Sequence, residues 1–180
     1  ICGRSPLAVA RGLVGLVGRT PLVRIASLSE ATGCEVLGKA EFLNPGGSVK
    51  DRVAVRVVED ALAAGALRPG GLVTEGTVGS TGIALALVAK VKGLRCHVVM
   101  PDDAAIEKSQ NLEALGATVE RVRPVSITNR GHFVNIARQR AKEAAEGGSG
   151  GGFFADQFEN PSNFDAHYET TGPEIWEQAG

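Results

Sequence analysis

The 180-residue chain has no excess of charge of one sign. It carries 19 Lys and Arg residues against 20 Asp and Glu residues, which gives a formal net charge of −1. A protein that binds the phosphate backbone of nucleic acid needs a basic surface, so nucleic acid is excluded as an expected partner. Hydrophobic residues make up 43% of the chain and charged residues 22%, which are ordinary values for a globular protein with one substantial core.

Cysteine is also scarce. The three cysteines, Cys2, Cys34 and Cys96, are widely spaced and form no CxxC pair. An odd, scattered set suits a reducing compartment, so we expect a cytoplasmic or organellar protein (plastid or mitochondrion) and not a secreted one. Cys96 and His97 are neighbours in an apolar run, where adjacent side chains point to opposite faces of a strand, and we therefore expect no metal site.

Long hydrophobic runs are missing as well. No apolar stretch approaches the roughly 20 residues of a membrane span, so no membrane partner is expected. The first seventeen residues contain Arg4 and Arg11 and no acid, a pattern that fits either the end of an organelle transit peptide or an ordinary N-terminal arm. The chain begins with Ile1, which is consistent with processing or truncation.

What the sequence does contain is a regular alternation of strand-like and helical segments. β-Branched or aromatic runs bounded by Gly or Pro predict strands at 22–25, 35–41, 71–76, 96–101, 118–123 and 153–158. Helical periodicity predicts helices at 49–64, 82–92, 105–115 and 131–146. Ser48 is the expected N-cap of the first helix, and the expected stops are Gly65, Gly93 and Gly116.

This order of elements predicts an open α/β fold. Strand and helix alternate, and the strands are continuously apolar, as a mainly parallel sheet with helices on both faces requires. The glycine-rich stretch 147–152 is expected to be either a domain linker or a loop within the sheet.

Residues 76–82, GTVGSTG, follow a predicted strand and open a predicted helix. Ligands bind at this carboxyl end of the strands in open α/β sheets, and the free N–H groups of a helix start favour an anion. The stretch lacks the Gly-Lys-Ser/Thr of a phosphate-binding P-loop and the GxGxxG of a dinucleotide site, so we expect a small anion. A glycine-rich turn that serves packing alone is the alternative.

A second segment, NPGGSVKDR at 44–52, places Lys50 at the start of a helix. The positive end of the helix dipole and partial burial both lower the pKa of an amine. A neutral amine can condense with an aldehyde to form a Schiff base, so Lys50 is the candidate reactive group. A solvated lysine with no role is the alternative, and Asp51 and Arg52 are expected to position the helix start.

Five segments together identify a resemblance. GRTPLVRI, NPGGSVKDR, GTVGSTGIALA, MPDDAAIEKSQNLEALGA and TTGPEIWEQ occur in this order from about Gly18 to the last residue. They resemble the O-acetylserine sulfhydrylase (cysteine synthase) family, which belongs to the fold type II enzymes that use pyridoxal 5′-phosphate.

The resemblance implies roles for particular residues. It implies that Lys50 is the lysine that forms the Schiff base with the cofactor, and that Ser80 contacts the cofactor ring. The loop that binds the substrate carboxylate corresponds to Thr77, Val78, Gly79, Ser80 and Thr81, with Gln157 as a further carboxylate contact and Phe158 beside it in the cleft wall.

Two residues depart from the family pattern. Ser80 stands where the family has asparagine and donates one hydrogen bond where an amide donates two. Val78 stands where the family has serine, and its side chain donates none. These departures leave the substrate preference open.

The resemblance also predicts the organisation of the protein. We expect residues 46–156 to form a small, nearly complete α/β domain, and residues 1–45 and 157–180 to be pieces of a second, truncated cofactor-binding domain. In the family, the loop that binds the cofactor phosphate follows the TTGPEIW helix, so we expect the chain to be the N-terminal half of a longer enzyme, inactive as a fragment.

The expected reaction of the full-length enzyme is a β-replacement in which O-acetylserine and sulfide give cysteine and acetate, and the family leads us to expect a homodimer. Two alternatives remain. One is another reaction of the same cofactor, either cystathionine β-synthesis or serine/threonine dehydration. The other is a non-catalytic homologue that binds a partner.

Overall fold

The computed structural model describes residues 9–10, 12–148 and 150–180. Most of the N-terminal stretch discussed above, including Cys2, Arg4 and Arg11, lies outside the described residues. The elements, in chain order, are the 3₁₀ helix η1 (Leu13–Leu16), β1 (Leu22–Arg24), α1 (Ala26–Thr32), β2 (Leu37–Lys39), the 3₁₀ helix η2 (Glu41–Leu43), α2 (Lys50–Ala63), β3 (Leu72–Gly76), α3 (Ser80–Val91), β4 (Arg95–Pro101), α4 (Ile106–Ala114), β5 (Thr118–Val122), α5 (Phe133–Glu146), β6 (Gly152–Phe154), α6 (Pro161–Ala166), the π-helical turn η3 (His167–Thr171) and α7 (Gly172–Ala179).

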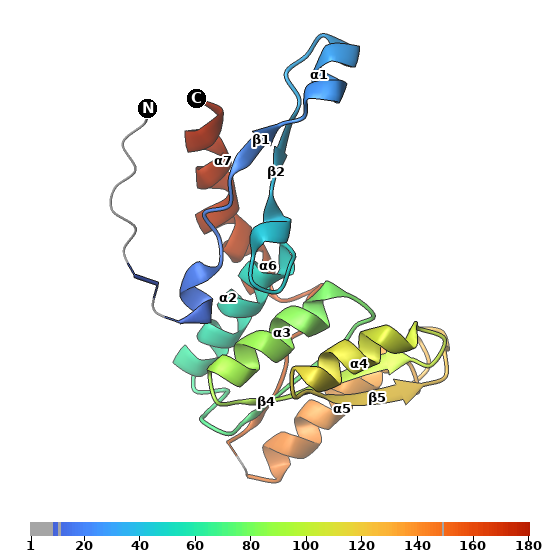
Figure 1. Cartoon of the computed structure of the whole chain (residues 1–180). Coiled ribbons are helices and arrows are strands. Elements are labelled where there is room, and N and C mark those ends of the chain that lie inside the picture. The colour runs from blue at the N-terminus through green and yellow to red at the C-terminus, as the bar shows by residue number, and fades with distance from the viewer. Residues whose placement is uncertain (1–8, 11, 149) are drawn as a thin grey trace.

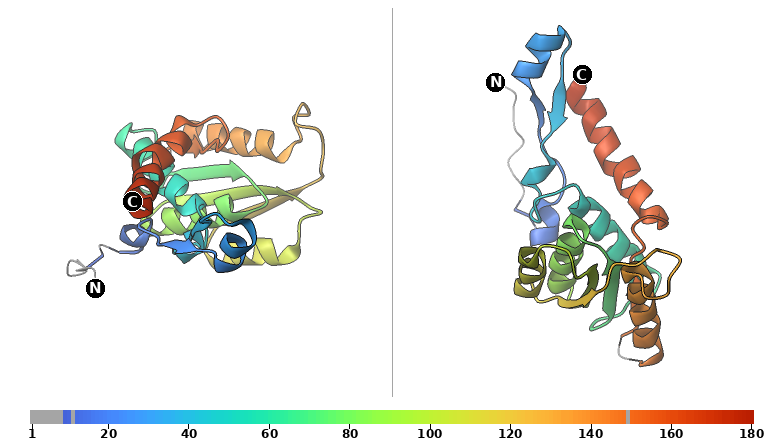
Figure 2. Two further views of the ribbon diagram at one scale, coloured as in Figure 1. Left: turned by 90° about the horizontal axis from the view of Figure 1, so that it is seen from above. Right: turned by 90° about the vertical axis from the view of Figure 1, so that its right-hand side faces the viewer.

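Four parallel strands form the central sheet, in the order β5-β4-β3-β6. Helices α3 and α4 cover one face and α5 covers the other, while α2 packs on α3 (Figures 1 and 2). Apolar side chains from α2, α3 and the strands fill the space between, among them Val58, Val73, Leu85 and Val98, which are at most 1% exposed. The predicted open, parallel α/β fold is confirmed.

The remaining elements project from this body. Strands β1 and β2 pair with each other and with no other strand in the described part of the chain, as an antiparallel ribbon that carries α1 at its tip. The ribbon extends away from the central sheet, and α7 lies along it near the C-terminus (Figure 1). Among the described residues, no helix is long and apolar enough to cross a bilayer.

Glycines at the ends of the helices explain why the helix predictions agree with the structure. Gly65, Gly93 and Gly116 have φ of 72°, 67° and 92°, the left-handed conformation that ends a helix at low cost. The four predicted helices correspond to α2, α3, α4 and α5, with ends shifted by at most two residues.

Two strand predictions were wrong in extent. The strand expected at 35–41 is only Leu37–Lys39, because the chain turns into η2 at Glu41. The strand expected at 153–158 ends at Phe154, because Asp156 adopts φ of 50° and turns the chain out of the extended conformation. Gln157 and Phe158 therefore lie in a turn and not in the sheet.

The described part of the glycine-rich stretch 147–152 connects α5 to β6 within the sheet, and Gly152 is the first residue of β6. The carbonyls of Gly150 and Gly151 accept hydrogen bonds from Arg68 and Leu72, which fastens this stretch beside the start of β3. Of the two expectations for this segment, the structure has the loop within the sheet.

Candidate active site

The turn that precedes α2 is fixed by a buried amide. The Asn44 side chain donates to the carbonyls of Glu41 and Ser48, at 2.9 and 3.1 Å, and its Oδ1 accepts from the Gly18 amide at 2.8 Å. Asn44 is 4% exposed, so these bonds replace water at the turn. They set the direction in which the chain enters α2.

Lys50 is the first residue of α2 and is half-buried. The capping position is one residue later than expected: Val49 is the N-cap, and Ser48 Oγ accepts from the Lys50 amide at 3.2 Å. Burial lowers the pKa of His167, and the charges of Lys50 and Arg52 lower it further.

The glycine pair before Lys50 has a steric cause. A Cβ on Gly46 would lie 2.5 Å from Asp51 Oδ1, and Gly47 has φ of 80°. The Asp51 carboxylate is fully buried and accepts a short hydrogen bond from the Gly46 amide. Burial raises the pKa of Asp51, against the lowering effect of that bond. Asp51 therefore holds the glycine turn against the start of α2.

The second loop, residues 76–82, lies at the carboxyl end of β3, an inner strand of the sheet. Thr77 and Thr81 are 7% and 5% exposed, whereas Val78 is 39% exposed. The Gly79 amide donates to Thr77 Oγ1 at 3.3 Å. α3 begins at Ser80, so its unpaired N–H groups face the loop, as an anion site requires.

Gln157 is brought to this loop from the far end of the chain. Thr81 Oγ1 donates to Gln157 Oε1 at 2.6 Å, a contact between residues 76 positions apart. Phe158 does not lie in the same hollow. It is 77% exposed and lines a separate cavity of about 600 Å³ with residues of α6, η3 and α7, including Asn163, Phe164, His167, Tyr168 and Thr171.

A pocket of about 260 Å³ joins the two loops. Gly46, Gly47 and Ser48 line one side, and residues 78–80 line the other. The remaining walls come from Ile83, Met100, Lys108 and Leu112. The structure thus brings Val78, Gly79 and Ser80 to the segment that ends in Lys50. The pocket is not lined by Lys50, Thr77, Thr81 or Gln157. Thr77 and Thr81 flank the lining residues 78–80 in the sequence, and Gln157 contacts Thr81.

Sequence reasoning missed Glu75, the residue before the loop. Its side chain is 1% exposed, and it accepts hydrogen bonds from the amides of Gly76 at 2.8 Å and Gln157 at 3.1 Å. Burial raises the pKa of Glu75 to about 7, against the lowering effect of these two bonds. The available signal was an acid in an otherwise apolar inner strand, GLVTEG, where charged residues are rare.

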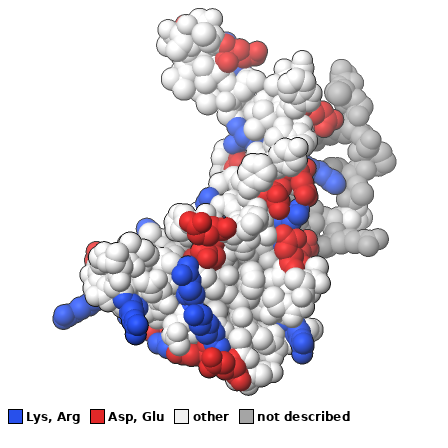
Figure 3. All heavy atoms as spheres, turned by 180° about the vertical axis from the view of Figure 1, so that it is seen from behind, with Lys and Arg blue, Asp and Glu red and all other residues white. Residues whose placement is uncertain are grey.

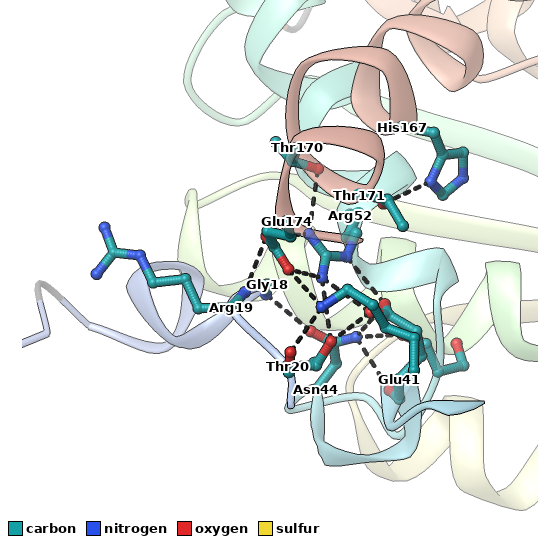
Figure 4. A network of polar contacts seen from close by, with 12 residues as sticks. Gly18, Arg19, Thr20, Glu41, Asn44, Arg52, His167, Thr170, Thr171 and Glu174 are labelled. Atoms are coloured by element: carbon teal, nitrogen blue, oxygen red, sulfur yellow. Dashed lines mark hydrogen bonds and ion pairs between the residues drawn. The ribbon is translucent and has the colours of Figure 1, made fainter. Parts of the chain in front are cut away.

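Arg52 is the centre of a polar network between α2, β2, η2 and α7 (Figure 4). Its guanidinium is paired with Glu41 at 2.8 Å and with Glu174 at 2.7 Å, and Lys39 reaches Glu174 at 2.7 Å. Burial alone would raise the pKa of Glu174, but hydrogen bonds from Arg52 and Lys39 lower it to about 2. The network ties the first turn of α2 to both projecting segments.

Elsewhere on the surface the charges are mixed. Figure 3 shows acidic and basic side chains next to one another on the face opposite to that of Figure 1. Among the described residues, no group of three or more His, Cys, Asp or Glu is placed to hold a metal ion.

The sequence matches the family described as pyridoxal-phosphate dependent enzyme over residues 13–180. The chain belongs to this family. Cysteine synthase 2 of Neurospora crassa is 59% identical over 174 residues, and cysteine synthase 2 of Schizosaccharomyces pombe is 51% identical over 174 residues. A crystal structure of O-ureido-L-serine synthase matches with a TM-score of 0.83 and 38% sequence identity.

These matches cover nearly all of the chain but only part of each relative. They span 94% of the chain in both cysteine synthases and 96% in the solved structure. The same matches cover 38% and 44% of the two cysteine synthases and 51% of the O-ureido-L-serine synthase chain. The chain thus spans about half or less of the length of these family members.

The residues around the pocket fit the cofactor of the family, pyridoxal 5′-phosphate. Ser80 lines the pocket with its neighbours Val78 and Gly79, and the glycine turn on the other side of the pocket leads into Lys50, the first residue of α2. An amine is the group that binds the aldehyde of this cofactor covalently, and a hydroxyl can donate to its ring oxygen. The assignment of the individual site residues remains a prediction.

Proposed function

We propose that this chain is the N-terminal part of a pyridoxal-phosphate-dependent enzyme that converts O-acetylserine and sulfide into cysteine and acetate. The observation that carries the proposal is the pocket between the two loops. Residues 46–48, which precede Lys50 in the chain, line one side of it, and residues 78–80 line the other. The identity to two cysteine synthases across both segments supports the choice of reaction.

In this proposal, the substrate carboxylate is bound by the loop of residues 77–81 and by Gln157. The amides at the start of α3 offer N–H donors, and the Thr81 hydroxyl and Gln157 amide are already joined at 2.6 Å. Ser80 donates a hydrogen bond to the cofactor ring oxygen. These contacts orient the Cα–H bond of the substrate toward Lys50.

When bound, pyridoxal phosphate withdraws electrons from Cα of the substrate and so makes the Cα proton acidic. Lys50 would hold the cofactor covalently, and its free amine would take the Cα proton of the substrate. The Cβ–O bond to acetate breaks, the Cβ–S bond to sulfide forms, and Lys50 returns the proton to Cα.

Exclusion of water requires the loop to close on the substrate, and Gly79 is where we place that movement. A Cβ added at Gly79 would meet no atom within 4 Å, whereas one at Gly76 would lie 2.5 Å from Val134 Cα and one at Gly82 3.0 Å from Thr77 Cγ2. Gly76 and Gly82 therefore serve close packing, and Gly79 has room to move.

The domain organisation is part of the proposal. Residues 46–156 form the small domain, and residues 1–45 and 157–180 are pieces of a second, cofactor-binding domain that further polypeptide completes. This division is supported by the β1–β2 ribbon, which pairs with no third strand among the described residues, and by the exposure of the apolar side chains Phe42 (72%) and Trp176 (84%). By resemblance, the full-length protein is a homodimer. The unpaired cysteines Cys34 and Cys96 suit a reducing compartment, the cytoplasm or an organelle.

The test uses the full-length protein and its Lys50→Ala variant. The wild type is expected to show the visible absorbance of the lysine-bound cofactor and to form cysteine from O-acetylserine and sulfide, and Lys50→Ala is expected to lose both. Ser80→Ala should lower cofactor affinity by about tenfold or less, as expected for one neutral hydrogen bond. Equal losses in the two variants would contradict these roles. The 180-residue chain alone is expected not to retain the cofactor at a one-to-one ratio.

Val78 and Ser80 weaken the choice of this reaction, because they differ from the family pattern in the loop that contacts substrate, and so leave a second candidate. It is cystathionine β-synthesis or serine/threonine dehydration with the same Lys50. Serine plus homocysteine, or serine alone, assayed against O-acetylserine plus sulfide separates these reactions. A full-length protein that binds no cofactor covalently would instead support the non-catalytic, partner-binding alternative.

A further inference from the structure

The buried carboxylate of Glu75 lies between the two segments proposed to bind the substrate carboxylate. It is the fourth residue of β3, immediately before the loop of residues 76–82, and it is 1% exposed. A carboxylate removed from water in an apolar sheet is costly and needs compensating hydrogen bonds. Nothing in the proposed chemistry uses this group, so its position calls for another explanation.

Its two carboxylate oxygens accept hydrogen bonds from two different segments of the chain. Oε1 accepts from the amide of Gly76, at the entrance to the loop, and Oε2 accepts from the amide of Gln157, 82 residues later. Gln157 is then held a second time, by the hydroxyl of Thr81 at the start of α3. The backbone and the side chain of Gln157 are thus fastened to opposite ends of the same loop.

The turn that presents the Gln157 amide is itself built for this contact. Asp156 has φ of 50°, a conformation that aspartate tolerates better than most residues. The Asn160 side chain donates to the carbonyl of Ala155 at 2.9 Å, and the Asn163 side chain donates to that of Gln157 at 2.8 Å. The carbonyls of Ala155 and Gln157 are therefore bonded to side chains and that of Asp156 to the backbone amides of Glu159 and Asn160, while the Gln157 N–H donates to Glu75.

We propose that Glu75 is a positioning residue that fixes Gln157 relative to residues 77–81, so that the two segments bind one substrate carboxylate together. This inference rests on the proposed function for its substrate. Glu75 itself does not contact the substrate in this proposal. Glu75 acts through the backbone of Gly76 and Gln157.

The first experiment compares Glu75→Gln with wild type in the full-length protein. Glutamine has the same size but keeps a single acceptor oxygen, so one of the two N–H groups loses its partner. We expect KM for O-acetylserine to rise about tenfold while kcat stays within about twofold, because binding is loosened and the chemistry at Lys50 is unchanged. Glu120→Gln, a carboxylate on β5 that contacts Arg140 and His97, is the matched control and should change neither constant.

A double-mutant cycle tests the route of the effect. If Glu75 acts by placing Gln157, then Glu75→Gln should raise KM far less in a Gln157→Ala background, because the side-chain amide that Glu75 positions is no longer present. Additive effects, an unchanged KM, or a loss confined to kcat would each overturn the inference.

Amide hydrogen exchange gives a readout that needs no turnover. In Glu75→Gln, exchange should accelerate by about tenfold at one of the two amides, that of Gly76 or that of Gln157, which loses its acceptor, and exchange in β4 should stay as in wild type. Unchanged exchange at both amides would refute the positioning role of Glu75. Absence of cysteine formation by the wild type would instead refute the proposed reaction and leave the exchange result to decide on Glu75 alone.

Discussion

Replacement of Arg52 tests whether the network in Figure 4 holds the β1–β2 ribbon and α7 to helix α2 of the central body. The Arg52 side chain is 3% exposed, and those of Glu41 and Glu174 are 15% and 19% exposed. Arg52→Ala leaves two largely buried carboxylates without their shared cation. Loss of one partner of a buried ion pair costs about 3 to 5 kcal/mol. Because Lys39 still pairs with Glu174, we expect the lower end, about 3 kcal/mol.

Arg56, one helical turn further along α2, is the matched control. Its side chain is 30% exposed, and its partners Asp60 and Glu169 are 43% and 54% exposed. Exposed pairs of this kind contribute little, so Arg56→Ala should destabilise the protein far less than Arg52→Ala. Urea unfolding of the full-length variants, read as midpoint and slope, measures both costs. Equal destabilisation by the two substitutions would refute the reasoning that burial of Arg52 sets its contribution.

Two further predictions concern stability. The pKa of Glu174 is lowered to about 2, so the stability that this carboxylate contributes is present above its unfolded pKa of about 4.5 and is lost as pH falls from there toward 2. Glu174→Gln should therefore flatten the decline of the urea midpoint over this range, and a decline as steep as that of wild type would contradict it. Gly152→Ala should destabilise the protein by about 1 to 3 kcal/mol, because the new Cβ would lie 2.0 Å from the carbonyl oxygen of Ala141 and force α5 away from β6. Gly147→Ala, where the nearest atom is 3.4 Å away and φ is −74°, should cost almost nothing, and thermal unfolding of the pair distinguishes a packing effect from a general effect of glycine.

Local signals in the sequence were sufficient for most of the fold. The helix ends followed from glycines that adopt positive φ, such as Gly93 and Gly116, because a left-handed stop depends on one residue and its neighbours. The loop at 76–82 and the turn before Lys50 were found in the same way. Both segments have glycine where the backbone must turn or approach closely.

What the sequence did not reveal depends on contacts between distant residues. Residues 155–158 have the composition of a strand, yet the bond from the Gln157 amide to Glu75 takes the chain out of the sheet. The pairing of Arg52 with Glu174 joins positions 122 apart. No local pattern encodes which carboxylate meets which amide or guanidinium, so these features required the folded structure.

The first turn of α2 carries Lys50 and Arg52, with a single residue between them. Each residue of an α-helix advances the side-chain direction by about 100°, so this separation sets the angle between the Lys50 amine, proposed to be reactive, and the Arg52 guanidinium. Insertion of one residue here would swing one of the two groups by more than a quarter of a circle, and compensation elsewhere in the chain could not restore both. We therefore expect the chain to tolerate no insertion or deletion between Lys50 and Arg52.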